Sequence, residues 1–234
     1  MQKSPFDDPQ QSVLPLHSLF SPNGDHDWIE VAKVLREKGF QVLTPSLTPD
    51  LLSNYDNCVS FLAEEIKNNS SNKVHIVSLS SVRFLALKLT MAHPNLVSSV
   101  LISGFITYPL LVRLLAVIPI YITKRRVSRR IGGPKFTLRN CRSISKMLTP
   151  LRDLQSLEAN TMMVVASIGD WLQPSLTLRK KRHGNADFSV KQAKKEKPLY
   201  HLWNRQRPIL FADLVGAWAN NTWSDELDAV FVNI

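Results

Sequence analysis

The chain has 234 residues, 44% hydrophobic content and a formal net charge of +10. This length fits a single domain with a substantial core, so we expect residues 1–234 to form one domain. The two cysteines, Cys58 and Cys141, are too few and too far apart for a disulfide framework or a metal site. No apolar leader follows Met1, and these features together predict a cytoplasmic globular protein with reduced thiols.

The positive charge is concentrated in one part of the chain. Residues 101–150 carry 10 Lys and Arg and no Asp or Glu, whereas residues 1–100 carry 8 basic and 10 acidic side chains. The excess is therefore a local feature rather than a property of the whole fold. No nucleic-acid-binding motif accompanies the basic residues, so we expect no nucleic-acid partner.

Strand and helix patterns alternate along the chain. Short apolar runs predict strands, and apolar residues at helical spacing predict helices, the first of which stops at Gly39. The predicted strands are 12–17, 41–43, 74–77, 96–102, 161–166 and a weaker 186–190; the predicted helices are 28–37, 55–67, 82–92, 172–181 and 208–219. Such alternation predicts a three-layer α/β/α fold around a mostly parallel sheet of about six strands, none of them predicted to be antiparallel.

Residues 104–157 interrupt this alternation. They begin with an apolar run from Thr107 to Tyr121 and turn sharply basic at Lys124. The apolar run covers about fifteen residues, fewer than the roughly twenty that a transmembrane helix needs, and it contains Arg113 and two prolines. We therefore predict a small helical cap inserted into the domain.

A serine lies in the predicted strand-to-helix turn at residues 78–82. Ser78, Leu79, Ser80, Ser81 and Val82 occupy the five places of the pattern G-x-S-x-G, in which the middle serine is held on a strained turn as a nucleophile. The serine is present and both glycines are replaced. The motif alone is therefore a weak match.

Further segments occur in the order in which the α/β-hydrolase superfamily has them, and the chain resembles that superfamily through most of its length. The matching segments are Leu14-Pro15-Leu16-His17-Ser18-Leu19, Asp27-Trp28, Lys38-Gly39-Phe40-Gln41-Val42, His93-Pro94-Asn95-Leu96-Val97, Leu101-Ile102-Ser103-Gly104, residues 164–170 and His201-Leu202-Trp203-Asn204 with Pro208. Each segment is unspecific by itself, but their common order makes the resemblance specific.

The resemblance implies a catalytic triad of Ser80, Asp170 and His201, which follow one another in the chain order of this superfamily. A serine hydroxyl needs a base to take its proton, and a histidine can take that proton and later return it to the leaving group. The carboxylate fixes the imidazole tautomer and stabilises the imidazolium.

The same analogy assigns the oxyanion hole and the substrate pocket. Backbone N–H groups of Leu19 and Ser81 would hold the developing oxyanion, in a loop shaped by His17. The apolar half of the predicted cap would line a pocket for a hydrophobic chain. The predicted substrate-binding residues are His17, Leu79, Tyr108 and Leu111.

Two departures from the superfamily pattern leave a second interpretation open. Ser18 stands where a glycine is usual in the oxyanion loop, and Val82 replaces the second glycine of the elbow. A β-branched side chain at that position must find room between helix and strand. The alternative to a hydrolase is thus a non-catalytic ligand-binding protein on the same scaffold.

The expected reaction is hydrolysis of a carboxylic ester or thioester of an apolar acyl group, with no cofactor and no metal. Esterase, thioesterase, lipase and C–C hydrolase remain alternatives, because a fold does not specify a substrate. The basic half of the cap is either a solvated face or a contact for an acidic carrier protein or an anionic lipid surface.

Overall fold

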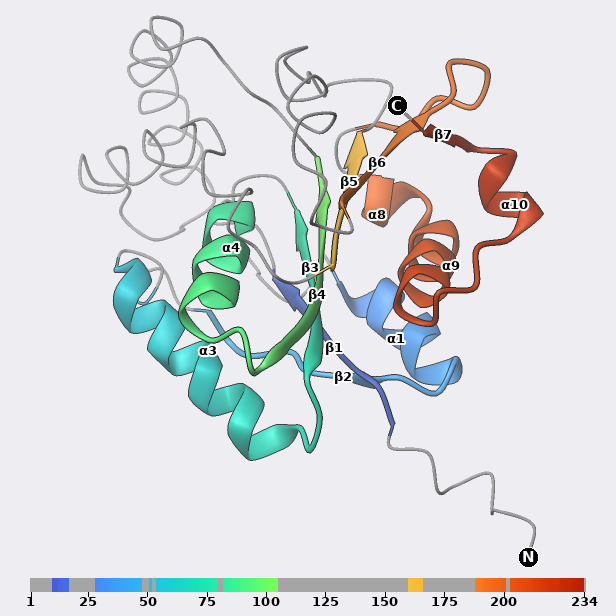
Figure 1. The fold of residues 1–234 in the computed structure, drawn as a ribbon. Helices are drawn as coiled ribbons and strands as arrows, with labels where there is room; N and C mark the ends of the chain where they lie inside the picture. Colours follow the sequence, from blue (N-terminus) through green and yellow to red (C-terminus); the bar gives the residue numbers. More distant parts are fainter. Residues whose placement is uncertain are drawn as a thin grey trace, which may run out of the picture.

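The structure is a computed structural model that describes residues 10–16, 28–47, 51, 54–79, 82–104, 160–165, 188–200 and 203–233. These residues form a seven-stranded sheet in the order β2-β1-β3-β4-β5-β6-β7, with helices on both faces (Figure 1). The strands are β1 (Ser12–Leu16), β2 (Gln41–Val42), β3 (Val74–Leu79), β4 (Val97–Ser103), β5 (Asn160–Val165), β6 (Phe188–Ala193) and β7 (Phe231–Asn233). The helices are α1 (Ile29–Glu37), α3 (Tyr55–Asn69), α4 (Arg83–Ala92), α8 (Trp203–Gln206), α9 (Pro208–Ala219) and α10 (Asp225–Asp228).

The predicted three-layer architecture with a mostly parallel sheet is confirmed. The predicted helix at 172–181 and residues 105–157 of the predicted cap lie outside the described residues. The prediction that all strands are parallel is wrong. β7 pairs with β6 in antiparallel register, with Phe231 opposite Ala193. A strand of three residues is too short to produce an alternating pattern, so β7 has no recognisable signal in the sequence.

Neighbouring residues of the central strands enter two separate cores. In β1, Leu14 packs with α3 and α4 on one face of the sheet, while Val13 packs with α1 and α9 on the other. Successive side chains of a strand point to opposite faces, so a strand covered on both sides must be apolar throughout. This explains why all six residues of β3 are buried, and why its sequence is a continuous rather than an alternating apolar run.

The helix ends follow from local sequence. Gly39 follows α1 with a φ of +88°, a conformation that glycine adopts without strain, and the predicted stop at this residue is confirmed. The side chain of Asn54 accepts hydrogen bonds from the backbone N–H groups of Asp56 and Asn57, which caps the start of α3.

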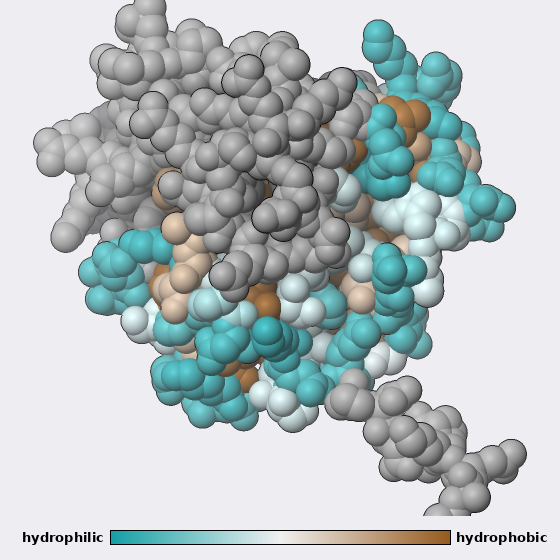
Figure 2. Space-filling model, viewed as in Figure 1, coloured by the Kyte–Doolittle hydropathy of each residue, from teal (hydrophilic) through white to brown (hydrophobic). Residues whose placement is uncertain are grey.

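The face of the molecule shown in Figure 2 is mainly polar where it belongs to the described residues. Hydrophilic side chains dominate the part of the surface that is drawn in colour on the face shown in Figure 2. Within the described ranges, none of the helices combines the length and the apolar character needed to cross a membrane.

Candidate active site at the carboxyl ends of the strands

The carboxyl ends of four neighbouring strands meet at one edge of the sheet. Leu16 of β1 pairs with Ser78 of β3, Leu79 pairs with Ser103 of β4, and Ser103 pairs with Val164 of β5. Open parallel sheets place their ligand sites at this edge. The chain segments that carry the predicted site residues leave from these strand ends.

Leu79 is the single predicted site residue within the described part of the chain. It is 2% exposed and lies in the core cluster on the α1 and α9 face. The predicted residues outside the described part are Ser80, Asp170, His201, Leu19, Ser81, His17, Tyr108 and Leu111. The elements on either side of these residues therefore supply the geometry of the site.

The connection from β3 to α4 is short. β3 ends at Leu79, and the backbone at Val82 has a φ of −79° and a ψ of −3°, which is already a helical conformation. Only Ser80 and Ser81 remain for the turn. A strand that passes into a helix within such a short turn is the arrangement that a nucleophile elbow requires.

The two residues in place of the elbow glycines are both buried. Val82 is 0% exposed and belongs to the core cluster that α3 and α4 form with the sheet. Ser78 is also 0% exposed, and its hydroxyl donates to the carbonyl of Leu101 over 3.3 Å. The β-branched side chain of Val82 is thus accommodated in the core between α4 and the sheet, at the position where a glycine is usual.

The beginning of α4 offers positive potential to the turn before it. Among the described residues no side chain caps this helix, and its first turn contains no acidic residue. The first N–H groups of a helix have no partner within the helix and carry partial positive charge. Arg83, at the first position of α4, adds a guanidinium group that is 2% exposed. The start of the helix therefore favours an anion at the turn.

Trp203 anchors the segment that follows His201. This residue begins α8, is 0% exposed, and donates a hydrogen bond from Nε1 to Oγ of Ser103 over 3.0 Å. Ser103 is buried at the carboxyl end of β4, directly opposite Leu79 in register. The segment next to the predicted base is therefore fixed beside the strand that leads to the predicted nucleophile.

Aromatic packing makes this anchor rigid. The Trp203 ring lies 4.5 Å from the ring of Phe211 in α9 and 5.7 Å from the ring of Phe231 in β7, measured between centroids. Phe211 in turn contacts Trp28 at 5.6 Å in an edge-to-face arrangement. From the sequence, Trp203 and Ser103 were named only as parts of segments that resemble the superfamily. The contact could have been suspected from the fact that a buried indole N–H needs a hydrogen-bond acceptor.

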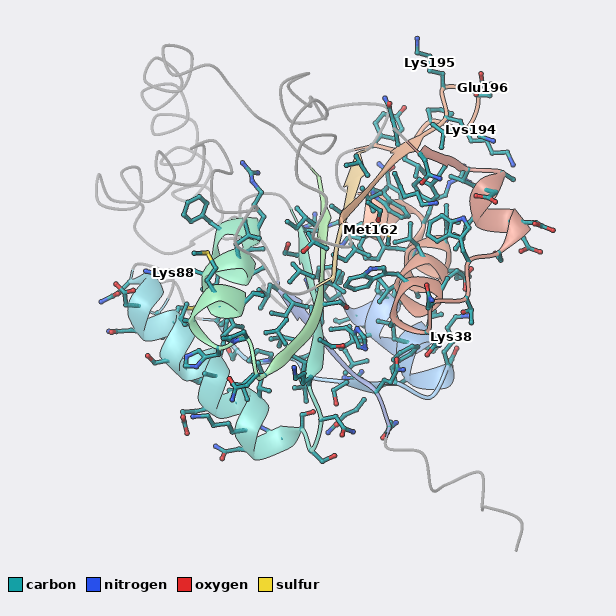
Figure 3. The ribbon with its side chains drawn as sticks, viewed as in Figure 1. Lys38, Lys88, Met162, Lys194, Lys195 and Glu196 are labelled. Carbon is teal, nitrogen blue, oxygen red and sulfur yellow. The ribbon has the colours of Figure 1, made fainter. Side chains whose placement is uncertain are left out.

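The strand before Asp170 lies next to β4. In β5, Met162 is 2% exposed and packs on the α1 and α9 face, where Figure 3 shows it between the sheet and the last helices.

Within the described ranges, no group of three or more His, Cys, Asp or Glu side chains is placed to hold a metal ion.

Comparison with known proteins agrees with this architecture. No protein-family model matches the chain. An "AB hydrolase superfamily protein" of Gibberella zeae is 26% identical over 235 residues, a match that covers 89% of this chain and 79% of that protein.

Solved structures of several hydrolases superpose on most of the chain. The thioesterase domain from the curacin biosynthetic pathway has a TM-score of 0.59 at 16% identity and covers 88% of this chain and 91% of its own. MGS-MChE2, an α/β-hydrolase enzyme from a lagoon-sediment metagenome, has a TM-score of 0.60 at 18% identity, with 91% of each chain covered. The meta-cleavage product hydrolase CumD has a TM-score of 0.60 at 16% identity and covers 90% of this chain and 91% of its own. The chain therefore has the α/β-hydrolase fold.

Proposed function

We propose that the protein is a serine hydrolase that cleaves a carboxylic ester or thioester of an apolar acyl group. Ser80 is the nucleophile, His201 the general base and acid, and Asp170 the carboxylate that orients His201. The observation that carries the proposal is the buried hydrogen bond from Trp203 to Ser103, which brings the segment after His201 next to β3.

The proposed reaction has two steps. Ser80 Oγ attacks the carbonyl carbon while His201 takes the hydroxyl proton, and collapse of the tetrahedral intermediate releases the alcohol or thiol with that proton. Water, activated by His201, then hydrolyses the acyl-serine ester and releases the carboxylic acid.

Electrostatic support for the oxyanion comes from the start of α4. The proposed donors are the backbone N–H groups of Ser81 and Leu19, and one such donor contributes on the order of 10²–10³ in rate. The first turn of α4, which has no acidic residue and no side-chain cap among the described residues, reinforces the positive potential at this end of the sheet.

The substrate class rests on the chemistry of a triad and on the sequence of the cap. Similar structures include a thioesterase domain, a meta-cleavage product hydrolase and a haloalkane dehalogenase, so the fold is compatible with cleavage of several bond types. A Ser-His-Asp triad serves acyl transfer, and the apolar run of residues 107–121 favours a hydrophobic acyl chain. In the same proposal, Tyr108 and Leu111 line the acyl pocket together with His17 and Leu79.

Covalent labelling with a fluorophosphonate probe tests the nucleophile. We expect the native protein and a Ser81→Ala variant to be labelled, and a Ser80→Ala variant to remain unlabelled. Ser81→Ala is the matched control because it removes the neighbouring hydroxyl from the same turn. Equal labelling of native protein and Ser80→Ala, or no labelling of either, would argue against the proposal.

A non-catalytic ligand-binding protein is the second candidate, favoured by Val82 in place of the second elbow glycine and by Ser18 in the oxyanion loop. It predicts that the protein binds an apolar ligand but does not turn over p-nitrophenyl esters. Hydrolysis of these esters that disappears in His201→Ala would exclude this candidate.

The partner of the basic part of residues 104–157 is a separate proposal. An acidic carrier protein or an anionic lipid surface would complement its 10 Lys and Arg side chains. Co-sedimentation with liposomes that does not depend on their anionic lipid content would remove the lipid surface from this proposal.

A further inference from the structure

A pocket opens at the edge of the sheet opposite the candidate active site, where β1, β3 and β4 begin. Its volume is about 600 Å³, and its walls come from the residue before β1, the end of α1, the start of β3, the start of β4 and the end of α9. We propose that this pocket binds a small molecule that carries a phosphate or carboxylate group. The lining residues that carry the argument are Gln10, Lys38, Lys73, His75, Ser98 and Asn220.

This pocket is separate from the candidate active site. His75 and Leu79 lie four residues apart on β3, which corresponds to about 13 Å at the usual rise of a strand. The proposed nucleophile follows Leu79 at the carboxyl end of the strand, whereas His75 lines the pocket near the amino end. The inference therefore does not depend on the hydrolase activity.

The charge of the lining favours an anion. Two lysines line the pocket, and its lining within the described part of the chain includes no Asp or Glu. Lys38 forms an ion pair with Asp213 of α9 at 2.8 Å, which holds its side chain in place and offsets part of its charge, so Lys73 is the main cation offered to a ligand. Lys73 is exposed at the start of β3, and among the described residues no carboxylate lies within ion-pair distance of it. Its full charge is therefore available to a ligand.

The two helix ends at this pocket contribute little opposing charge. The last carbonyls of a helix normally carry partial negative charge, which would repel an anion. Here the carbonyls of Val34, Leu35 and Arg36 accept backbone N–H groups of residues 38–40. Those of Gly216, Ala217 and Trp218 accept backbone N–H groups of residues 220–222. Unsatisfied carbonyls thus do not offset the charge of Lys73 at this pocket.

His75 supplies a neutral imidazole to the wall. It is 7% exposed, and burial lowers its pKa, so the ring is uncharged at neutral pH. Its Nδ1 lies 2.7 Å from Oγ of Ser99, and its ring packs edge-on against Trp218. When the Ser99 hydroxyl donates to Nδ1, the proton of the ring is on Nε2, where it can donate to an oxyanion.

Amide and hydroxyl side chains complete the set of donors. Gln10 is held at the rim because its Nε2 donates to the carbonyl of Gly39 over 2.8 Å. Ser98 and Asn220 line the same pocket and carry further O–H and N–H donors. Phosphate and carboxylate groups have several acceptor oxygens, so a pocket that combines ammonium, amide, hydroxyl and imidazole donors matches their chemistry.

Titration of the full-length ¹⁵N-labelled protein, followed by NMR, tests the proposal. Sodium phosphate and sodium citrate are added separately, and sodium chloride at equal ionic strength is the reference. We expect saturable shifts of the signals of Lys73, His75 and Ser98 with at least one of the two oxyanions. A stronger response to phosphate assigns a phosphorylated ligand, and a stronger response to citrate assigns a carboxylic acid.

Two lysine variants decide whether the pocket is responsible. Lys73→Gln removes an exposed cation at the pocket, and we expect it to weaken binding about tenfold, the effect of losing one charge-assisted hydrogen bond. Lys195→Gln is the matched control, because Lys195 is exposed in the turn after β6, outside the pocket lining (Figure 3). Unchanged affinity in Lys73→Gln, or identical shifts with sodium chloride, would overturn the proposal.

Discussion

Trp203 and Ser103 stand 100 residues apart in the chain and are joined by a buried hydrogen bond of 3.0 Å between Nε1 and Oγ. Neither side chain is exposed to solvent. The bond links the beginning of α8 to the carboxyl end of β4, so the last third of the chain is fixed to the middle of the sheet. Trp203 lies two residues after His201, and Ser103 pairs with Leu79, the residue before Ser80.

Replacing Trp203 by Phe tests this link. The change leaves the Ser103 hydroxyl without its donor and removes part of a buried ring, so we expect the free energy of unfolding to fall by about 2–3 kcal/mol. If the link positions His201, kcat falls in addition while KM changes little. Urea denaturation and ester hydrolysis measure the two effects.

Trp223→Phe is the matched control. The Trp223 indole donates to the exposed carboxylate of Asp228, where water can replace the lost partner, so we expect a loss below about 1 kcal/mol and unchanged kcat. Equal effects of the two substitutions would contradict the role given to the buried bond.

Restoring the elbow glycine destabilises the protein. Val82→Gly removes a side chain that is 0% exposed and adds backbone freedom next to α4, so we expect a loss of about 2–4 kcal/mol in unfolding free energy. Val232→Ala, on a side chain that is 40% exposed, serves as the control and costs within about 0.5 kcal/mol. A neutral or stabilising Val82→Gly would show that the core does not need this side chain.

The buried His75 makes stability depend on pH. Burial lowers its pKa below the ordinary value of 6.5, so on acidification the unfolded chain binds a proton before the folded chain does. Above pH 6.5 the imidazole is neutral in both states and does not change the free energy of unfolding. As the pH falls from 6.5 towards the lower pKa of His75 in the folded protein, only the unfolded chain gains the proton, so the free energy of unfolding decreases. His75→Gln removes this titration, and we expect the variant to lose less stability than native protein between neutral and mildly acidic pH. Thermal unfolding in phosphate-free buffer at several pH values provides the measurement; parallel profiles would contradict the assignment.

The Cys58 thiol is inert in the folded protein. Cys58 lies in α3 with 0% exposure, and burial raises its pKa to about 12. Because the thiolate is the reactive form, we expect a Cys141→Ser variant to react with a disulfide reagent only as fast as it unfolds. The same variant in denaturant is the control and reacts at once. Rapid labelling of the native variant would show that α3 opens locally.

Much of this fold could be predicted because its central elements have strong local signals. The glycine at 39 predicted the end of α1, and the helix predicted at 208–219 has the bounds of α9. β6 was predicted as 186–190 and lies at Phe188–Ala193, since its partly polar sequence blurs the boundary. β7 was missed, because a three-residue edge strand is defined by its pairing with β6 rather than by its own pattern.

Some features of the candidate site could also be predicted from the sequence, and others could not. The short turn after Leu79 could be predicted from a β-branched run followed by small residues and a helical pattern. Whether Val82 fits could not be predicted, because the space around it depends on α3, which comes from another part of the chain. The bond between Trp203 and Ser103 could not be predicted either, since neither residue type by itself indicates a partner so distant in sequence.

The order of the strands has a consequence for where any ligand can bind. From β1 the chain moves to β2 on one side and then returns to β3 on the other side. The helix after β1 packs on one face and the helix after β3 on the opposite face, so the connections that leave Leu16 and Leu79 diverge. This divergence is a topological switch point, at which an open sheet forms a crevice regardless of the side chains present. This strand order does not depend on glycines at the elbow, so it favours a ligand site at this edge for a hydrolase and for a binding protein alike.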